Sequence, residues 1–171
     1  MTGVKKDKVY AFIDGNNLYL GAKAQGITIH YGDFRLYLRN KLGAEKVFLF
    51  IGYDPRNATL YKMLQRYGYI LVFKPTIPYV EDGARTMKGN VDAELVLHCA
   101  AIEYPDFDKA VIVTSDGDFA CLVQYLVERG KLAKIITPTE FHSSLFQPYT
   151  SYILPISRIK AKISRINKKK K

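Results

Sequence analysis

Five short apolar segments alternate along the chain with segments of helical spacing, and this alternation limits the fold more than any other feature. Each apolar segment is bounded by turn residues, which is typical of a buried strand. The predicted strands are residues 8–13, 45–53, 69–73, 110–113 and 131–137. Strands separated by helices imply βαβ units, a parallel sheet and helices on both of its faces. We therefore expect an α/β protein, a three-layer α/β/α sandwich with a mostly parallel sheet of about five strands.

Apolar residues at helical spacing fill most of the stretches between these strands. We predict helices at residues 18–24, 31–42, 57–67, 91–104 and 119–129, a weak short helix at 141–147, and a short strand or coil at 152–154. Residues 74–90 contain two prolines and two glycines and have no sustained period. We expect them to form a loop, and a loop of this length in a compact domain is usually functional or mobile.

The net charge of +10 is concentrated at the C-terminal end of the 171-residue chain. Eight of the 26 Lys and Arg residues lie within residues 158–171, where no acid occurs, so the remaining 18 nearly balance the 16 Asp and Glu residues. The tail therefore favours association with a polyanion, although terminal lysines also occur simply as solubilising residues.

The same C-terminal residues have a helical pattern of apolar positions. Ile156, Ile159, Ile163 and Ile166 predict an amphipathic helix whose isoleucines face the body of the protein or a partner, with lysines outward. We therefore divide the chain into one domain at residues 1–155 and a basic amphipathic tail at residues 156–171.

The sequence disfavours a membrane or secreted protein. No run approaches the roughly 18 apolar residues of a membrane-spanning helix, and the charged N-terminal segment leads directly into a strand without a secretory signal. Cys99 and Cys121 have no Cys-x-x-Cys spacing, so we expect two buried, reduced thiols. These features predict a cytoplasmic protein without a membrane partner.

Aspartates follow two of the predicted strands at the point where each strand ends. Asp14 comes directly after the first strand, and Asp116 and Asp118 flank a glycine after the fourth. The carboxyl ends of parallel strands lie at one edge of a sheet, where ligands collect. If the first and fourth strands are neighbours, these acids meet within metal-binding distance, but the residues alone do not give the strand order. A third acidic site, Asp92 with Glu94, begins the helix before the fourth strand.

Each of these aspartates also has an ordinary structural interpretation. A carboxylate in the first turn of a helix interacts favourably with the helix dipole, Asn90 can cap the helix of Asp92, and Asp14 with Asn16 is a typical turn pair. Repetition favours a metal site instead, because three separate helix starts on one side of the sheet each carry an acid. Neighbouring carboxylates repel one another, and a bound Mg²⁺ or Mn²⁺ relieves that repulsion. No His or Cys cluster favours zinc.

A hard divalent cation at such a site supports phosphodiester hydrolysis, since it supplies a nucleophilic water and stabilises charge on the phosphoryl oxygens. We expect Asp118 to orient water or to cap its helix, and Thr114 and Ser115 to be candidates for hydrogen bonds to that water. The metal ligands predicted from the sequence are Asp14, Asp92 and Asp116. With Asp118 they form the predicted catalytic set.

Three segments of the sequence resemble motifs of the NYN branch of the PIN-like nuclease superfamily, which includes the bacterial LabA-type proteins. They are VYAFIDGNNLY at residues 9–19, KGNVDAEL at 88–95 and AVIVTSDGDFACLVQYLVERGK at 110–131, and the resemblance extends over roughly residues 8–155. It implies a Rossmann-like, PIN-like fold with strand order 3-2-1-4-5, in which the first and fourth strands are neighbours. It also implies an endoribonuclease that depends on Mg²⁺ or Mn²⁺ and binds RNA, and such relatives often form homodimers.

The resemblance also gives roles to individual residues by motif position. Asn17, beside Asn16, corresponds to a polar position that supports the substrate or a metal-bound water. The acidic site of the family corresponds to Asp14, Asp92, Asp116 and Asp118.

This chain departs from the family near its second motif. Many relatives carry a further acid one or two turns after the Val-Asp pair, where this chain has His98, and Glu94 is a longer or additional acid. If His98 lines the site, the site has one negative charge fewer, although a lone His on a helix is more often a core or surface residue. Arg85 and Lys88 precede Asp92 and are candidates for contacts to phosphates, or for a solvated loop.

Two other functions compete with the nuclease. A haloacid-dehalogenase-type phosphatase also starts from a strand-end aspartate, but it needs a second acid two residues later to protonate the leaving group, where this chain has Asn16. A non-catalytic RNA-binding or scaffold module of the same fold is the stronger alternative. The basic tail and the 13 tyrosines favour it, since exposed aromatic rings can stack on bases.

Overall fold

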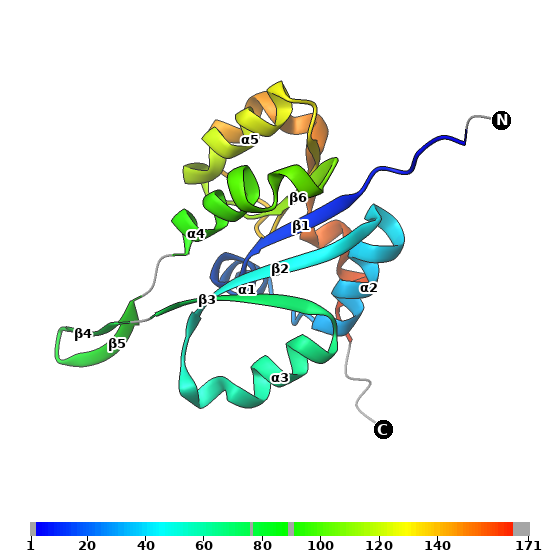
Figure 1. Cartoon of the computed structure of the whole chain (residues 1–171). Coiled ribbons are helices and arrows are strands. Elements are labelled where there is room, and N and C mark those ends of the chain that lie inside the picture. The colour runs from blue at the N-terminus through cyan, green and yellow to red at the C-terminus, as the bar shows by residue number, and fades with distance from the viewer. Residues whose placement is uncertain (1–2, 76, 89–90, 166–171) are drawn as a thin grey trace.

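The protein is an α/β sandwich built on a parallel sheet (Figure 1). The computed structural model describes residues 3–75, 77–88 and 91–165, without the side chains of residues 75, 79, 81 and 85–88. The main sheet consists of β1 (Val9–Asp14), β2 (Ala44–Tyr53), β3 (Tyr69–Pro75), β6 (Lys109–Val113), β7 (Leu132–Thr137) and β8 (Ile153–Pro155). The α/β class and the layered, mostly parallel arrangement expected from the sequence are thereby confirmed.

The order of the strands in this sheet is β3-β2-β1-β6-β7-β8, and every neighbouring pair is parallel. The five strands predicted from the sequence therefore occur in the order 3-2-1-4-5, and the short sixth strand β8 extends the sheet at one edge. β1 and β6 are paired from Val9 with Lys109 to Ile13 with Val113. The first and fourth predicted strands are thus neighbours at the centre of the sheet.

Helices cover both faces of the sheet (Figure 1). One core contains buried side chains of α1 (Gly15–Ala24), α2 (Tyr31–Leu42) and α3 (Ala58–Arg66), and the other contains those of α4 (Asp92–Leu97) and α5 (Ala120–Glu128). β1 shows the alternation that makes this possible, because Ala11 and Ile13 face the first core while Tyr10 and Phe12 face the second. The remaining short turns are η1 (Pro55–Asn57), η2 (His98–Ile102), η3 (Tyr104–Asp106), η4 (Gly117–Phe119) and η5 (Ser144–Tyr152).

Residues 74–90, which the sequence predicted to be a loop, form a hairpin over most of their length. β4 (Ile77–Glu81) and β5 (Ala84–Lys88) pair antiparallel and project from the carboxyl end of β3 (Figure 1). Asp82 and Gly83 connect them with φ angles of 49° and 76°. Two consecutive residues with positive φ are the requirement of a tight hairpin turn, and Asp-Gly satisfies it.

The C-terminal segment packs into the first core and is less helical than its isoleucine pattern predicted. A 3-10 turn, η6 (Ile156–Ile159), leads into the single turn α6 (Lys160–Ile163), and the helix ends there rather than at residue 167. Ile156, Ile159 and Ile163 are buried against the sheet face that carries α1 and α2. Ile166 and the terminal lysines lie outside the described residues.

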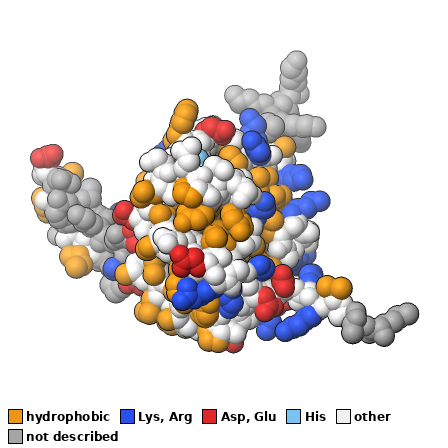
Figure 2. All heavy atoms as spheres, turned by 90° about the horizontal axis from the view of Figure 1, so that it is seen from above, with side chains coloured by type: hydrophobic (Ala, Val, Ile, Leu, Met, Phe, Trp, Pro, Cys, Tyr) orange, Lys and Arg blue, Asp and Glu red, His pale blue; other side chains and the backbone are white. Residues whose placement is uncertain are grey.

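The face that carries α4 and α5 has an uneven charge distribution. Figure 2 shows this face, and most of the Lys and Arg side chains in this view lie on the side away from the β4–β5 hairpin.

Cys99 is buried as expected, whereas Cys121 is exposed, so the expectation of two buried thiols is wrong for Cys121. Within the described residues, no helix has the length and apolar character needed to cross a membrane.

The burial of Ile163 makes a prediction about the tail. Ile163→Ala removes a fully buried side chain from the core, so we expect the free energy of unfolding to fall by about 2 to 5 kcal/mol. Lys160→Ala, an exposed change in the same helical turn, is the control and should change stability by about 0.5 kcal/mol or less. Urea unfolding measures both. Equal, small effects would show that residues 156–163 do not stabilise the domain.

Candidate functional site

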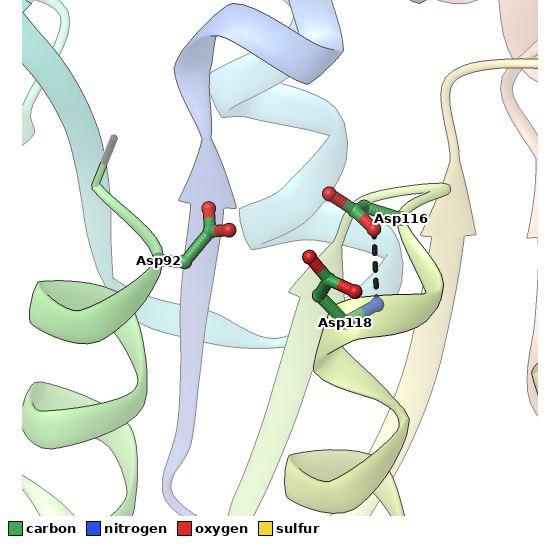
Figure 3. A group of neighbouring side chains, drawn as sticks. All are labelled: Asp92, Asp116 and Asp118. Carbon is green, nitrogen blue, oxygen red and sulfur yellow. Dashed lines mark hydrogen bonds between the residues drawn. The ribbon is translucent and has the colours of Figure 1, made fainter. Parts of the chain in front are cut away.

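Three aspartates from two segments meet at the carboxyl edge of the sheet. Asp92 is the first residue of α4, Asp116 follows β6, and Asp118 lies in η4 at the entrance to α5. Figure 3 shows the three side chains turned toward one another. One carboxylate oxygen from each lies within 4.8 Å of the others, and this is the group of potential metal ligands found among the described residues. Hard oxygen donors at this spacing fit Mg²⁺ or Mn²⁺.

The local fold fixes the orientation of Asp116. Its Oδ1 accepts a hydrogen bond from the backbone N–H of Asp118 at 2.9 Å and so caps η4 (Figure 3). The backbone N–H of Asp116 in turn donates to Thr114 Oγ1 at 3.1 Å. The sequence left Asp118 either to orient water or to cap its helix, and the residue that caps η4 is Asp116. Asp118 is exposed and contributes its carboxylate to the acidic group.

Asp14 is the last residue of β1 and is buried, with 6% of its surface exposed. Its Oδ1 accepts a hydrogen bond from the backbone N–H of Asn17 at 3.1 Å and caps α1. Burial raises the pKa of Asp14 to about 6, and repulsion from Asp92 and Asp116 adds to the increase, while backbone hydrogen bonds from Asn17 and Asn16 oppose it. Asp14 therefore interacts electrostatically with the acidic group without belonging to it.

A cleft of about 490 Å³ connects these acids. Asp14, Asp92 and Asp116, the three metal ligands expected from the sequence, all line it. Other lining residues that the sequence did not single out are Leu20, Gly21, Ala24, Val91 and Thr139. The three carboxylates whose oxygens lie within 4.8 Å of one another include Asp118, whereas the ligand set predicted from the sequence included Asp14 instead. The exact ligand set therefore stays a prediction.

Asn17 joins the two central strands at this edge. Its Oδ1 accepts a hydrogen bond from the backbone N–H of Ser115 at 2.8 Å, and so links the residues after β1 to the residues after β6. Ser115 Oγ accepts from the N–H of Thr139 at 3.1 Å, which adds the loop after β7. Thr114 is fully buried. The described hydrogen bonds of Asn17, Ser115 and Thr114 thus fix the backbone around the acids.

Gly15 permits the close approach of α1 to β2. A Cβ on Gly15 would collide with the side chain of Ile51 and would lie 2.8 Å from the carbonyl oxygen of Phe50. This residue is therefore restricted to glycine by packing. Asn16, the next residue, is exposed and lines the cleft beside Asp14.

Glu94 and His98 lie on the same helical segment as Asp92 but outside the acidic group. Glu94 forms an ion pair with Lys74, with Oε2 and Nζ 3.5 Å apart. The His98 ring packs against the rings of Phe50 and Phe48, with centroids 5.4 and 6.2 Å away. His98 is not among the residues that line the acidic cleft.

Three other residues from the sequence-based predictions have undescribed side chains. Arg85 and Lys88 belong to β5, but their side chains lie outside the description, so their contact with phosphates stays a prediction. Asn90, the expected cap of α4, also lies outside the described residues. Asp92 and Glu94 do occupy the first turn of α4 as expected.

The buried charge of Asp14 makes a prediction about stability. Because the pKa of Asp14 rises from 3.8 to about 6, the folded state holds the proton more tightly than the unfolded chain. The free energy of unfolding of the metal-free protein should therefore fall between about pH 4 and pH 6, by about 3 kcal/mol, and stay lower above this window. Asp14→Asn keeps a capping acceptor and has no such loss. Urea unfolding in EDTA at about pH 4 and pH 8 measures the difference.

Asp54 provides a matched control for this experiment. It is also an aspartate that caps a helical turn after a strand, but Arg56 hydrogen-bonds its carboxylate and lowers its pKa. Asp54→Asn should therefore bring no gain in stability at high pH. A gain for Asp54→Asn equal to that for Asp14→Asn would contradict the role of burial at Asp14.

Comparisons with known proteins agree with this geometry. A sequence model of the NYN domain matches residues 8–156. The crystal structure of a protein of unknown function from Vibrio parahaemolyticus superposes with a TM-score of 0.71 at 24% identity, over 91% of this chain and 96% of that one, and it supports the fold. No curated protein matches the sequence significantly. Because the match to the family covers nearly the whole described chain, the protein belongs to the NYN domain family, a PIN-like nuclease family.

Proposed function

We propose that the protein is a metal-dependent endoribonuclease that hydrolyses RNA phosphodiester bonds at the acidic cleft. The observation that carries the proposal is the convergence of Asp92, Asp116 and Asp118 at the carboxyl edge of the sheet. These side chains come from two separate segments, and the capping hydrogen bond of Asp116 does not account for the fact that all three face one another. Membership of the NYN family supports nuclease chemistry at this edge.

The donor set fits a hard divalent cation. Asp92, Asp116 and Asp118 each bring one carboxylate oxygen within 4.8 Å of the others, and Asp14 adds a further acid to the cleft that Asp92 and Asp116 also line. When bound, Mg²⁺ or Mn²⁺ would supply a water of lowered pKa and stabilise negative charge on the phosphoryl oxygens. Asn17 and Ser115 position this machinery indirectly, since their hydrogen bond links the ends of β1 and β6.

Several finer assignments are part of the proposal. RNA is the substrate that the family suggests, and the LabA-type branch is the expected relationship within it. The homodimer and the cytoplasmic location expected from the sequence also stay predictions. The non-catalytic RNA-binding module is the alternative that the activity experiment below distinguishes.

Binding of the cation can be measured without any substrate. A ligand present at about 100 times its Kd stabilises the folded state by about 2.7 kcal/mol, so we expect Mn²⁺ to raise the melting temperature by roughly 5 to 10 °C. Asp92→Asn should reduce this shift. Glu94→Gln is the matched control on the same helix, because Glu94 pairs with Lys74 instead, and it should keep the shift. A shift that depends on Glu94 as much as on Asp92 would contradict the ligand assignment.

Activity is tested with end-labelled single-stranded RNA in Mn²⁺, in Mg²⁺ and in EDTA. We expect internal cleavage with a metal, none in EDTA, and a loss of at least about 100-fold for Asp116→Asn, since even residues that only support metal ligands contribute about 10- to 100-fold. Asp54→Asn controls for the loss of an aspartate after a strand. Metal-dependent cleavage that survives Asp116→Asn would overturn the site, and RNA binding without cleavage in either metal would favour the non-catalytic module.

A further inference from the structure

A second pocket, of about 470 Å³, lies on the other side of the start of α1 from the acidic cleft. Its walls come from α1, the first residue of α2, the carboxyl end of β2, the end of η1 and α3, so it lies at the same edge of the sheet. Tyr19 and Tyr31 contribute from one side, and Asn57, Leu60 and Tyr61 from the other. The volume falls within the range of about 300 to 1,000 Å³ that is typical of small-molecule sites.

The lining of this pocket is uncharged, unlike that of the cleft. None of the residues that line it is Asp, Glu, Lys or Arg, whereas three carboxylates line the cleft. Burial raises the pKa of Tyr31, so its hydroxyl stays neutral. Aromatic rings, aliphatic side chains and two side-chain amides suit a flat, neutral ligand that offers both donors and acceptors.

The aromatic side chains differ in their freedom to contact a ligand. The Tyr61 hydroxyl donates to Gly52 O at 3.3 Å and accepts from the Asp54 N–H at 2.9 Å, so its ring is a fixed part of the wall. Tyr19 is 53% exposed, and the Lys23 ammonium lies over its ring, 5.7 Å from the centroid, so a base would stack on the ring surface that Lys23 leaves exposed. Asn57 precedes α3, yet its side chain makes no capping hydrogen bond, so its amide is not committed to the helix.

The pocket and the cleft meet at Asn16, which lines both. The two sites are therefore adjacent and share this one residue. One is an acidic site that suits a phosphodiester with a bound cation, and the other is a neutral aromatic site. A nucleotide has this same division, since its phosphate and its planar uncharged base are separated by one sugar. An unpaired base can leave its stack and insert between aromatic side chains, whereas a base within a duplex cannot.

We propose that this pocket binds a nucleobase of the RNA whose backbone lies in the acidic cleft, so that the substrate is single-stranded at the bound nucleotide. The identification of the polymer as RNA rests on the proposed function. Binding of a base in the pocket, however, does not require that the protein cleaves RNA. Tyr19 stacks on the base, and the amides of Asn16 and Asn57 face its polar edge. The same contacts make cleavage favour unpaired RNA.

The experiment measures binding in EDTA, where no cleavage is expected. Fluorescence anisotropy compares a labelled oligouridine with an abasic oligomer of the same length and backbone, so that phosphate contacts contribute equally to both. Stacking contributes about 1 to 3 kcal/mol per base, and we expect the protein to bind the oligouridine about 5- to 150-fold more tightly. Tyr19→Ala should reduce this preference to near unity and leave the affinity for the abasic oligomer unchanged.

Two variants separate stacking from a structural effect. Tyr19→Phe keeps the ring and should keep the preference. Tyr125→Ala removes a tyrosine from α5, on the opposite face of the sheet, and should also keep it. Tyr19 is exposed, so its replacement leaves the core intact.

The outcomes distinguish this inference from the proposed nuclease function. Wild-type protein without a base preference, or a preference that survives Tyr19→Ala, would overturn the pocket assignment even if the protein cleaves RNA. A base preference that is lost only with Tyr19→Ala would support the pocket even if no metal restores cleavage.

Discussion

The parallel pairing of β1 with β6 is the contact on which the candidate site depends. Their register, from Val9 with Lys109 to Ile13 with Val113, ends both strands at the same edge of the sheet. Asp14 and Asp116 therefore come within electrostatic range although about a hundred residues separate them in the chain. Apolar side chains on both faces of these two strands fix the pairing, because a slip by one residue would exchange the faces of each strand. The packing of the cores thus determines the position of the acids.

The arrangement of acids at the candidate site opposes the stability of the fold. Asp14 is buried beside Asp92 and Asp116, and both burial and repulsion favour its protonated form. The backbone N–H groups at the start of α1 offset part of this cost, since they hydrogen-bond the carboxyl of Asp14. A site of this kind persists because two large apolar cores stabilise the sheet that carries it. A divalent cation would relieve the repulsion that the apo protein tolerates.

The sequence was sufficient for five of the strands of the main sheet and for the strand-end acids, because apolar runs followed by aspartates are local patterns. The order of the strands came only from the family resemblance, since pairing between distant segments leaves no local pattern. The β4–β5 hairpin was missed although Asp82-Gly83 is a strong turn signal, because Pro75 and Pro78 obscured the alternation around it. The capping of η4 by Asp116 could not be predicted from the sequence, because it depends on the backbone dihedral angles of this turn. The pocket was missed because α1, β2 and α3 each contribute only a few of its side chains.

The four residues from Asp14 to Asn17 show how closely the cleft and the pocket are linked. Gly15 lets α1 begin against Phe50 and Ile51, at the end of β2, and any side chain there would force the two apart. This close approach leaves Asp14 and Asn17 on the cleft side, where Asn17 also bonds the backbone at Ser115, while Gly15 itself lines the neutral pocket. Asn16 lies between and lines both. A change at Gly15 would therefore disturb both sites together, so the proposed base pocket and the proposed phosphodiester site depend on the same local packing.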